Sequence, residues 1–120
     1  MRANIHTYHF YCLEVYWVDD GCPGSSTDVD GSFQPKSYQA SVRCCSNNGK
    51  NCMTPDDIEC PTNKMSYDDA FSKCSENDHR LCTKEELLSK VCCGTGGSCD
   101  SYEIWTATPQ SGGYIVIFNN

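Results

Sequence analysis

Alternating apolar and aromatic positions near the start of the chain predict its first strands. Residues 8–18 are rich in aromatic and β-branched side chains, which are typical of a strand. Residues 38–45 alternate apolar and polar positions and predict a second strand. Gly, Pro, Ser and Asp gather in residues 19–37, which predict a loop, and residues 46–64 predict another.

The spacing of apolar residues becomes helical after residue 65. Ser66 stands three residues before Asp69, which resembles a capping box with Asp in place of the usual Glu. The apolar residues that follow at i, i+3, i+4 and i+7 would share one helix face. They are Tyr67, Ala70, Phe71 and Cys74.

A second, shorter helix and two strands are predicted toward the end of the chain. Thr83 and Glu86 have the spacing of a capping box. Residues 94–100 form a Gly-rich turn, and residues 102–106 and 114–118 read as strands. The apolar residues expected to face inward from the short helix are Leu87, Leu88 and Val91.

These elements predict one α+β domain over residues 1–120, with two short helices packed on antiparallel strands. Its parts would be a strand-rich segment, a loop, the two helices and the terminal strands. In that order they span residues 1–45, 46–64, 65–93 and 94–120.

Composition changes the picture, because the chain is short of Leu, Ile, Val and Phe but holds 11 cysteines in 120 residues. Disulfides can replace a missing core, each stabilising by about 2–4 kcal/mol, and they require an oxidising compartment. We therefore expect a secreted, extracellular, disulfide-rich protein. The cysteines are Cys12, Cys22, Cys44, Cys45, Cys52, Cys60, Cys74, Cys82, Cys92, Cys93 and Cys99.

Two adjacent pairs of cysteines constrain the connectivity without fixing it. Cys44 and Cys45 would point to opposite faces of a strand and should have different partners, one of them Cys74 on the inner helix face. Cys92 and Cys93 should diverge likewise. The odd total leaves one cysteine over, for an intermolecular bridge, a reactive thiol or a buried free thiol.

The formal net charge of −7 argues against nucleic acid and anionic lipid as partners, since both need clustered Lys and Arg. The sequence has no apolar run of about 18 residues, so we expect no membrane insertion.

One acidic stretch has alternating oxygen ligands around a glycine turn, which suits a hard cation such as calcium. The Gly falls one place early for an EF-hand loop. An Asx-rich turn explains the same residues, and we favour it, so no cofactor is required. The candidate ligands are Asp28, Asp30 and Ser32.

Catalytic and zinc chemistry have little support in the sequence, so we predict that the chain is not an enzyme. His6, His9 and His79 stand apart from any nucleophile, and the cysteines lack the close pairs of zinc sites. Trp17 and Trp105 could stack on sugars, but we interpret them as core residues.

Residues 66–106 resemble the opening half of C-type-lectin-like domains, in which two helices carry a Leu-Cys-Thr pattern and a Trp begins the next strand. Residues 42–45, 80–87, 93–96 and 100–105 are also similar to cysteine-rich extracellular modules with VRCC, RLCT-x-EL, CGTG and DSYxxW motifs. The resemblance implies a small C-type-lectin-like fold. The calcium-binding tripeptides of sugar-binding members do not occur in this chain.

The order of the matching segments differs from that of the lectin-like fold, in which a strand like residues 41–44 comes last. The chain therefore looks like the end of one unit joined to the start of the next, or like a circular permutation. Its terminal strands either meet within one chain or complete a neighbouring chain. The candidate assembly residues are Tyr114, Ile115, Val116, Ile117 and Phe118.

Two functions follow as expectations. The first is a non-enzymatic recognition or adhesion module that binds a glycan (carbohydrate binding) or an extracellular protein. The second is a structural subunit that self-assembles head-to-tail, as a homo-oligomer or polymer, into an extracellular filament or matrix through its terminal strands.

Overall fold

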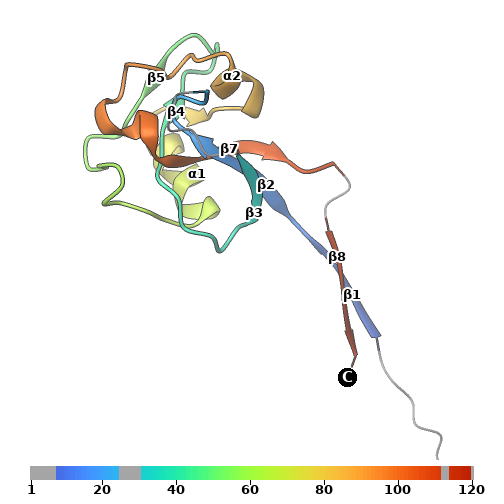
Figure 1. The fold of residues 1–120 in the computed structure, drawn as a ribbon. Coiled ribbons are helices and arrows are strands. Elements are labelled where there is room, and N and C mark those ends of the chain that lie inside the picture. The colour runs from blue at the N-terminus through green and yellow to red at the C-terminus, as the bar shows by residue number, and fades with distance from the viewer. Residues whose placement is uncertain (1–7, 25–30, 112–113, 120) are drawn as a thin grey trace, which may run out of the picture.

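The computed structural model describes residues 8–24, 31–111 and 114–119, and shows a small α+β body from which two strands extend (Figure 1). The helices are α1 (Tyr67–Glu76), α2 (Lys84–Leu88) and a 3-10 turn (Gly97–Ser101). The strands are β1 (Tyr8–Leu13), β2 (Val15–Asp20), β3 (Ser32–Pro35), β4 (Cys44–Cys45), β5 (Cys52–Met53), β6 (Arg80–Leu81), β7 (Glu103–Pro109) and β8 (Tyr114–Asn119).

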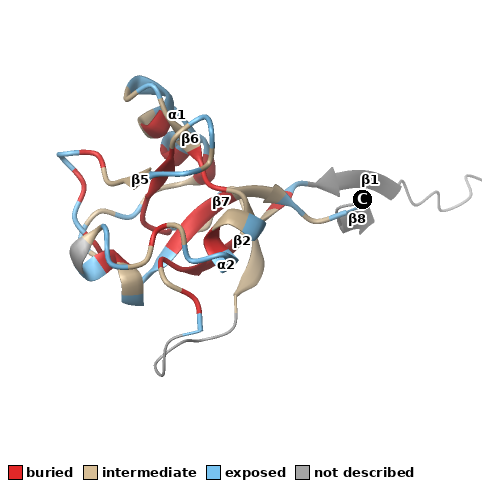
Figure 2. Ribbon diagram, turned by 90° about the horizontal axis from the view of Figure 1, so that it is seen from above, coloured by how far each residue is buried: buried red, intermediate tan, exposed pale blue. Residues whose placement is uncertain are grey.

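The described strands form three antiparallel sheets. Two have three strands each, in the orders β3-β2-β7 and β5-β4-β6. The third contains only β1 and β8, which pair along their whole length. Figure 2 shows the buried residues gathered where β2, β6 and β7 face the inner side of α1.

Trp105 on β7 is the centre of the main core. It is fully buried together with Val18, Val42 and Leu81, and its indole Nε1 donates a 2.8 Å hydrogen bond to the Met65 carbonyl. The prediction that Trp105 is a core residue is confirmed.

Trp17, which we also interpreted as a core residue, is only half-buried. The Lys84 ammonium lies 3.9 Å from its ring centroid, and Phe33 packs edge-on against it. The ring therefore makes a cation–π contact at the edge of the body and does not lie in the core.

Helix α1 begins at the predicted cap, where Ser66 Oγ accepts a hydrogen bond from the Asp69 amide. Its buried stripe is Tyr67, Ala70 and Cys74. The prediction that Phe71 shares this buried face is wrong in part, because its side chain is 51% exposed at the margin of the stripe.

Helix α2 begins with the predicted capping box, in which Thr83 and Glu86 satisfy each other's backbone amides. Leu87 is buried and Val91 is partly buried. Leu88, predicted to face inward, is 47% exposed, because a helix of only five residues has a narrow buried face.

The strand predictions need correction at three places. The predicted strand 8–18 is two strands in different sheets, divided at Glu14. Of the predicted strand 38–45 only β4 is regular, since residues 40 and 41 form single bridges to different partners. The predicted loops at 19–37 and 46–64 contain β3 and β5, which are too short to show a periodic pattern.

Candidate functional site

The β1–β8 ribbon, defined as Tyr8–Leu13 paired with Tyr114–Asn119, is the most unusual feature of the fold. Figure 1 shows it extending away from the helices and the other two sheets. Six residues a strand give it a length of about 20 Å. At its base, the Gln110 amide donates to the Val15 carbonyl at 3.0 Å, which ties β7 to β2 where the ribbon leaves the body.

The register of the ribbon pairs Tyr8 with Asn119 at one end and Leu13 with Tyr114 at the other. In sequence the two strands are mostly apolar and aromatic, and they contain no Lys, Arg, Asp or Glu.

An isolated two-stranded ribbon is at best marginally stable in water, and a strand edge without a partner offers free backbone donors and acceptors. Among the described strands, β1 and β8 pair only with each other, so each has one open edge. The terminal strands meet within one chain, which is one of the two arrangements that the sequence left open.

Five disulfides fix the body, and each joins residues that are 30 to 71 positions apart in the sequence. Their partners are Cys22–Cys93, Cys44–Cys74, Cys45–Cys82, Cys52–Cys92 and Cys60–Cys99. Cys44 and Cys45 have different partners, one of them Cys74, and Cys92 and Cys93 diverge, so these predictions are confirmed. Such a density of bridges is typical of proteins that fold in an oxidising compartment.

Because ten cysteines bond to one another, the chain leaves no cysteine with which Cys12 could pair internally. Cys12 lies on β1, opposite Ile115 of β8. The odd cysteine that the composition predicted is thus located on the ribbon.

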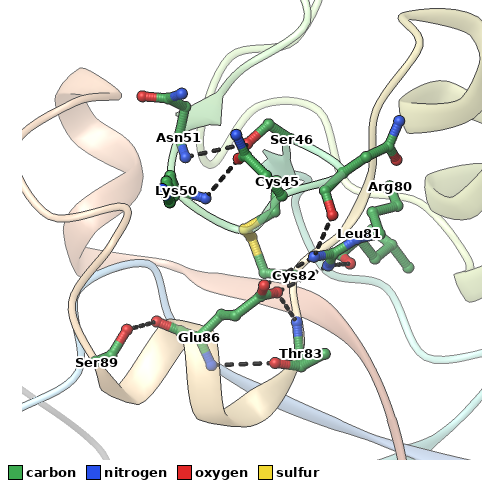
Figure 3. A network of polar contacts seen from close by, with 12 residues as sticks. Cys45, Ser46, Lys50, Asn51, Arg80, Leu81, Cys82, Thr83, Glu86 and Ser89 are labelled. Carbon is green, nitrogen blue, oxygen red and sulfur yellow. Dashed lines mark hydrogen bonds and ion pairs between the residues drawn. A yellow bond between two sulfur atoms is a disulfide. The ribbon is translucent and has the colours of Figure 1, made fainter.

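A polar network supports the Cys45–Cys82 bridge at the other end of the body (Figure 3). Both guanidinium nitrogens Nη1 and Nη2 of Arg80 donate to the Glu86 carboxylate at 2.8 Å. The Thr83 amide donates to the same carboxylate at 2.9 Å. Arg80, and to a lesser degree this amide, lower the pKa of Glu86 to about 2, and the pKa of Arg80 is raised in turn.

Arg43 is a buried cation at the centre of the body, with 1% of its surface exposed. Its guanidinium donates to Thr54 Oγ1 at 2.7 Å, to Thr95 Oγ1 and to the Cys92 carbonyl at 3.5 Å. In the described part of the chain no carboxylate forms an ion pair with it. Burial lowers the pKa of Arg43, and the charge of Asp100 partly offsets this.

An open cavity of about 590 Å³ is lined in part by Thr54 and Thr95, the two hydroxyl residues that accept hydrogen bonds from Arg43. It runs between β5 and the 3-10 turn. Its polar lining includes the hydroxyls and carboxylates of Thr54, Asp56, Glu59, Thr95 and Ser98.

Calcium binding by the three candidate ligands remains a prediction. Asp28 and Asp30 lie outside the described residues. Ser32 begins β3, and its Oγ accepts a hydrogen bond from Gln34 Nε2 at 2.9 Å.

The imidazole of His79 is positioned at the end of α1. His79 Nδ1 lies 2.6 Å from the Asn77 carbonyl, beside the end of α1. The bonded cysteines cannot act as nucleophiles while oxidised.

The chain matches no known family model, and comparison with curated proteins and with solved structures also finds no match. None of the described helices has the length and apolar character to cross a bilayer. The C-type-lectin-like fold therefore remains a prediction from the motifs.

Sequence reasoning missed two features of this body. One is buried Arg43, for which the only signal was a charged residue between Val42 and Cys44 in an apolar segment. The other is the cluster of sulfur atoms from Cys45, Cys52, Cys82 and Cys92, whose members come from separate parts of the chain.

Proposed function

We propose that this protein is a non-enzymatic extracellular structural subunit that associates with further copies of itself through the β1–β8 ribbon. The observation that carries the proposal is the pairing of the ribbon: two strands of mostly apolar sequence pair with each other and with nothing else among the described strands, which leaves two open edges. Such an element gains stability when a partner covers it.

The charges of the chain do not prevent a second copy from binding at the ribbon. The chain carries a net charge of −7, so two bodies in contact would repel each other. The ribbon contains no Asp, Glu, Lys or Arg, and its length of about 20 Å exceeds the Debye length of about 8 Å at physiological salt. Contact through the ribbons would join two chains while solvent and salt screen their acidic bodies from each other.

Cys12 gives this association a route to a covalent bond. It lies on β1, and its partner in the register is Ile115 of β8. A two-fold contact whose axis passes beside residue 12 would bring Cys12 of one chain against Cys12 of the other.

Light scattering across a dilution series of non-reduced protein tests the proposal with two matched variants. Ile117→Lys places a charge on the ribbon, whereas Phe71→Lys places one on an exposed apolar residue of the body. We expect the wild type and Phe71→Lys to form dimers or larger species, and Ile117→Lys to remain a single chain. Loss of association in Phe71→Lys alone would assign the contact to the body and contradict the proposal.

Cys12→Ser separates the covalent bond from the contact itself. We expect this variant to lose the disulfide-linked species on a non-reducing gel but to keep association in light scattering. A covalent species that persists in Cys12→Ser would show that another cysteine forms the bridge.

A recognition or adhesion module that binds a glycan or an extracellular protein is the second candidate, and the polar cavity favours it. Hydroxyl and carboxylate groups such as those of Thr54 and Glu59 are suitable partners for sugar hydroxyls. A glycan array tests this with Glu59→Ala and, as control, Glu85→Ala on the exposed side of α2. Signals that are equal in both variants, or none for the wild type, would remove the cavity as a glycan site.

A further inference from the structure

The open cavity between β5 and the 3-10 turn has a buried cation behind its wall. Arg43 donates hydrogen bonds to the hydroxyls of Thr54 and Thr95, and both of these residues line the cavity. Gly96 lines it as well, and a Cβ at this position would overlap the Arg43 guanidinium. Because residue 96 has no side chain, the guanidinium lies directly against the backbone that forms this part of the wall.

The hydrogen bonds of the two threonine hydroxyls determine what each can offer a ligand. A hydroxyl has one proton, and a hydroxyl that accepts from a guanidinium must direct that proton elsewhere. Thr95 donates its proton to the Cys92 carbonyl at 2.7 Å. Thr54 donates to no acceptor among the described residues, so its proton is left for a group in the cavity. A hydrogen bond from a cation strengthens the hydroxyl as a donor, which favours a ligand oxygen with negative charge.

The same cavity also holds acceptor groups. Asp56 and Glu59 line it, both are exposed, and neither forms an ion pair with any described residue. Ser98 donates its own proton to the Cys60 carbonyl at 2.8 Å, which leaves its oxygen as an acceptor. These groups favour a ligand donor, and the two carboxylates favour one that carries a positive charge.

The donor and the acceptors are close enough together for one small ligand to contact both. One residue separates Thr54 from Asp56, so their Cα atoms are at most about 7 Å apart. A purely anionic ligand would be repelled by Asp56 and Glu59, and a purely cationic one by Arg43. An ammonium with an acyl oxygen beside it satisfies both sides, and a volume of about 590 Å³ is in the range of small-ligand sites.

We propose that this cavity binds an α-ammonium group together with the acyl oxygen next to it, as found in a free amino acid or at the N-terminus of a peptide. Thr54, with Arg43 behind it, donates to the oxygen, and Asp56 and Glu59 accept from the ammonium. This inference rests on the second candidate function, recognition through the cavity, and does not depend on self-association.

Saturation-transfer NMR titrations of the full chain test the proposal with three probes: trialanine, N-acetyl-trialanine, which has no ammonium, and free alanine. Asp56→Asn removes a carboxylate of the cavity. Its matched control is Asp57→Asn, because the Asp57 carboxylate pairs with Lys73 at 2.8 Å and is not part of the lining. Thr54→Val removes the hydroxyl donor and Thr54→Ser keeps it, and thermal unfolding checks that each variant is folded.

We expect trialanine to bind the wild type, Asp57→Asn and Thr54→Ser alike. It should bind Asp56→Asn and Thr54→Val about tenfold more weakly, the effect of losing one charge-assisted hydrogen bond. N-acetyl-trialanine should bind the wild type more weakly than trialanine by a similar factor. Binding of free alanine would extend the site to free amino acids, whereas binding of trialanine without alanine would assign it to a peptide N-terminus.

Equal binding of trialanine and N-acetyl-trialanine, or no binding of any of the three probes, would overturn the proposal. So would trialanine binding that is unchanged in both Asp56→Asn and Thr54→Val. A glycan whose binding depends on Glu59, in a protein that binds none of the probes, would overturn this inference and leave recognition through the cavity standing.

Discussion

Glu86 combines three roles at the residue scale, because its carboxylate caps α2, pairs with Arg80 and lies beside the Cys45–Cys82 bridge. Its amide and guanidinium partners all bind the charged form. The pKa of Glu86 is about 2, below its ordinary value of 4.5, so folding is favoured where the carboxylate is ionised.

We predict that Glu86→Gln lowers the free energy of unfolding by about 1–2 kcal/mol at pH 7, a figure reduced for solvent screening because Arg80 is a third exposed. A lowered native pKa gives stability that is complete above pH 4.5 and declines as the pH falls toward 2. The difference between wild type and variant should therefore shrink over that interval. Urea unfolding at pH 7 and near pH 2.5, with exposed Glu85→Gln as control, measures it; a difference independent of pH would contradict the prediction.

Gly96 leaves no room for a side chain, even for the single Cβ atom of alanine. A Cβ there would overlap the Arg43 guanidinium, which Thr54, Thr95 and the Cys92 carbonyl hold in place. Gly94 offers a control, since it has a φ of +72° but no atom within 4 Å of the position that a Cβ would take.

We expect Gly96→Ala to cost about 2–3 kcal/mol through overpacking, and Gly94→Ala about 1 kcal/mol through backbone strain alone. Thermal unfolding of both variants compares them. If Gly94→Ala were the more damaging, the Arg43 guanidinium would have to be free to move.

At the scale of elements, the helix starts were the most predictable part of the fold. Ser66 and Thr83 cap α1 and α2 as predicted, because capping depends on residues three apart and needs no tertiary information. The strands were less predictable. β4, β5 and β6 have two residues each, so their pairing is set by the Cys44–Cys74, Cys45–Cys82 and Cys52–Cys92 bridges rather than by a periodic pattern.

We predict that Thr83→Ala destabilises the protein by about 1 kcal/mol, because the Glu86 amide loses its cap and the carboxylate loses half of the box. Ser66→Ala should cost less, since the Ser66–Asp69 hydrogen bond is longer, 3.4 Å against 3.1 Å. Denaturant unfolding of the two variants ranks them. A larger loss of stability in Ser66→Ala would contradict this ranking. It would mean that the cap contributes more to α1 than expected for a helix that already packs on Trp105.

At the scale of the whole molecule, the ribbon and the body are separable in the described structure, since β8 pairs only with β1. The sequence located the apolar terminal strand at residues 114–118, but it could not decide which strand would pair with it. That choice depends on where the body brings the two ends of the chain, which no local pattern encodes.

We therefore expect a chain that ends at residue 111 to keep the thermal unfolding transition of the body within a few degrees and to lose self-association. Calorimetry and light scattering on the same sample measure both. A collapse of the unfolding transition in the shortened chain would show that β8 contributes to the core.

All five disulfides cross the same segment of the chain. Every bridge joins a cysteine at or before Cys60 to one at or after Cys74, so all five cross the segment 61–73. A protease that cuts the chain once in this segment would release nothing. The product would be a two-chain protein, held by five covalent links, that separates into its halves only when it is reduced.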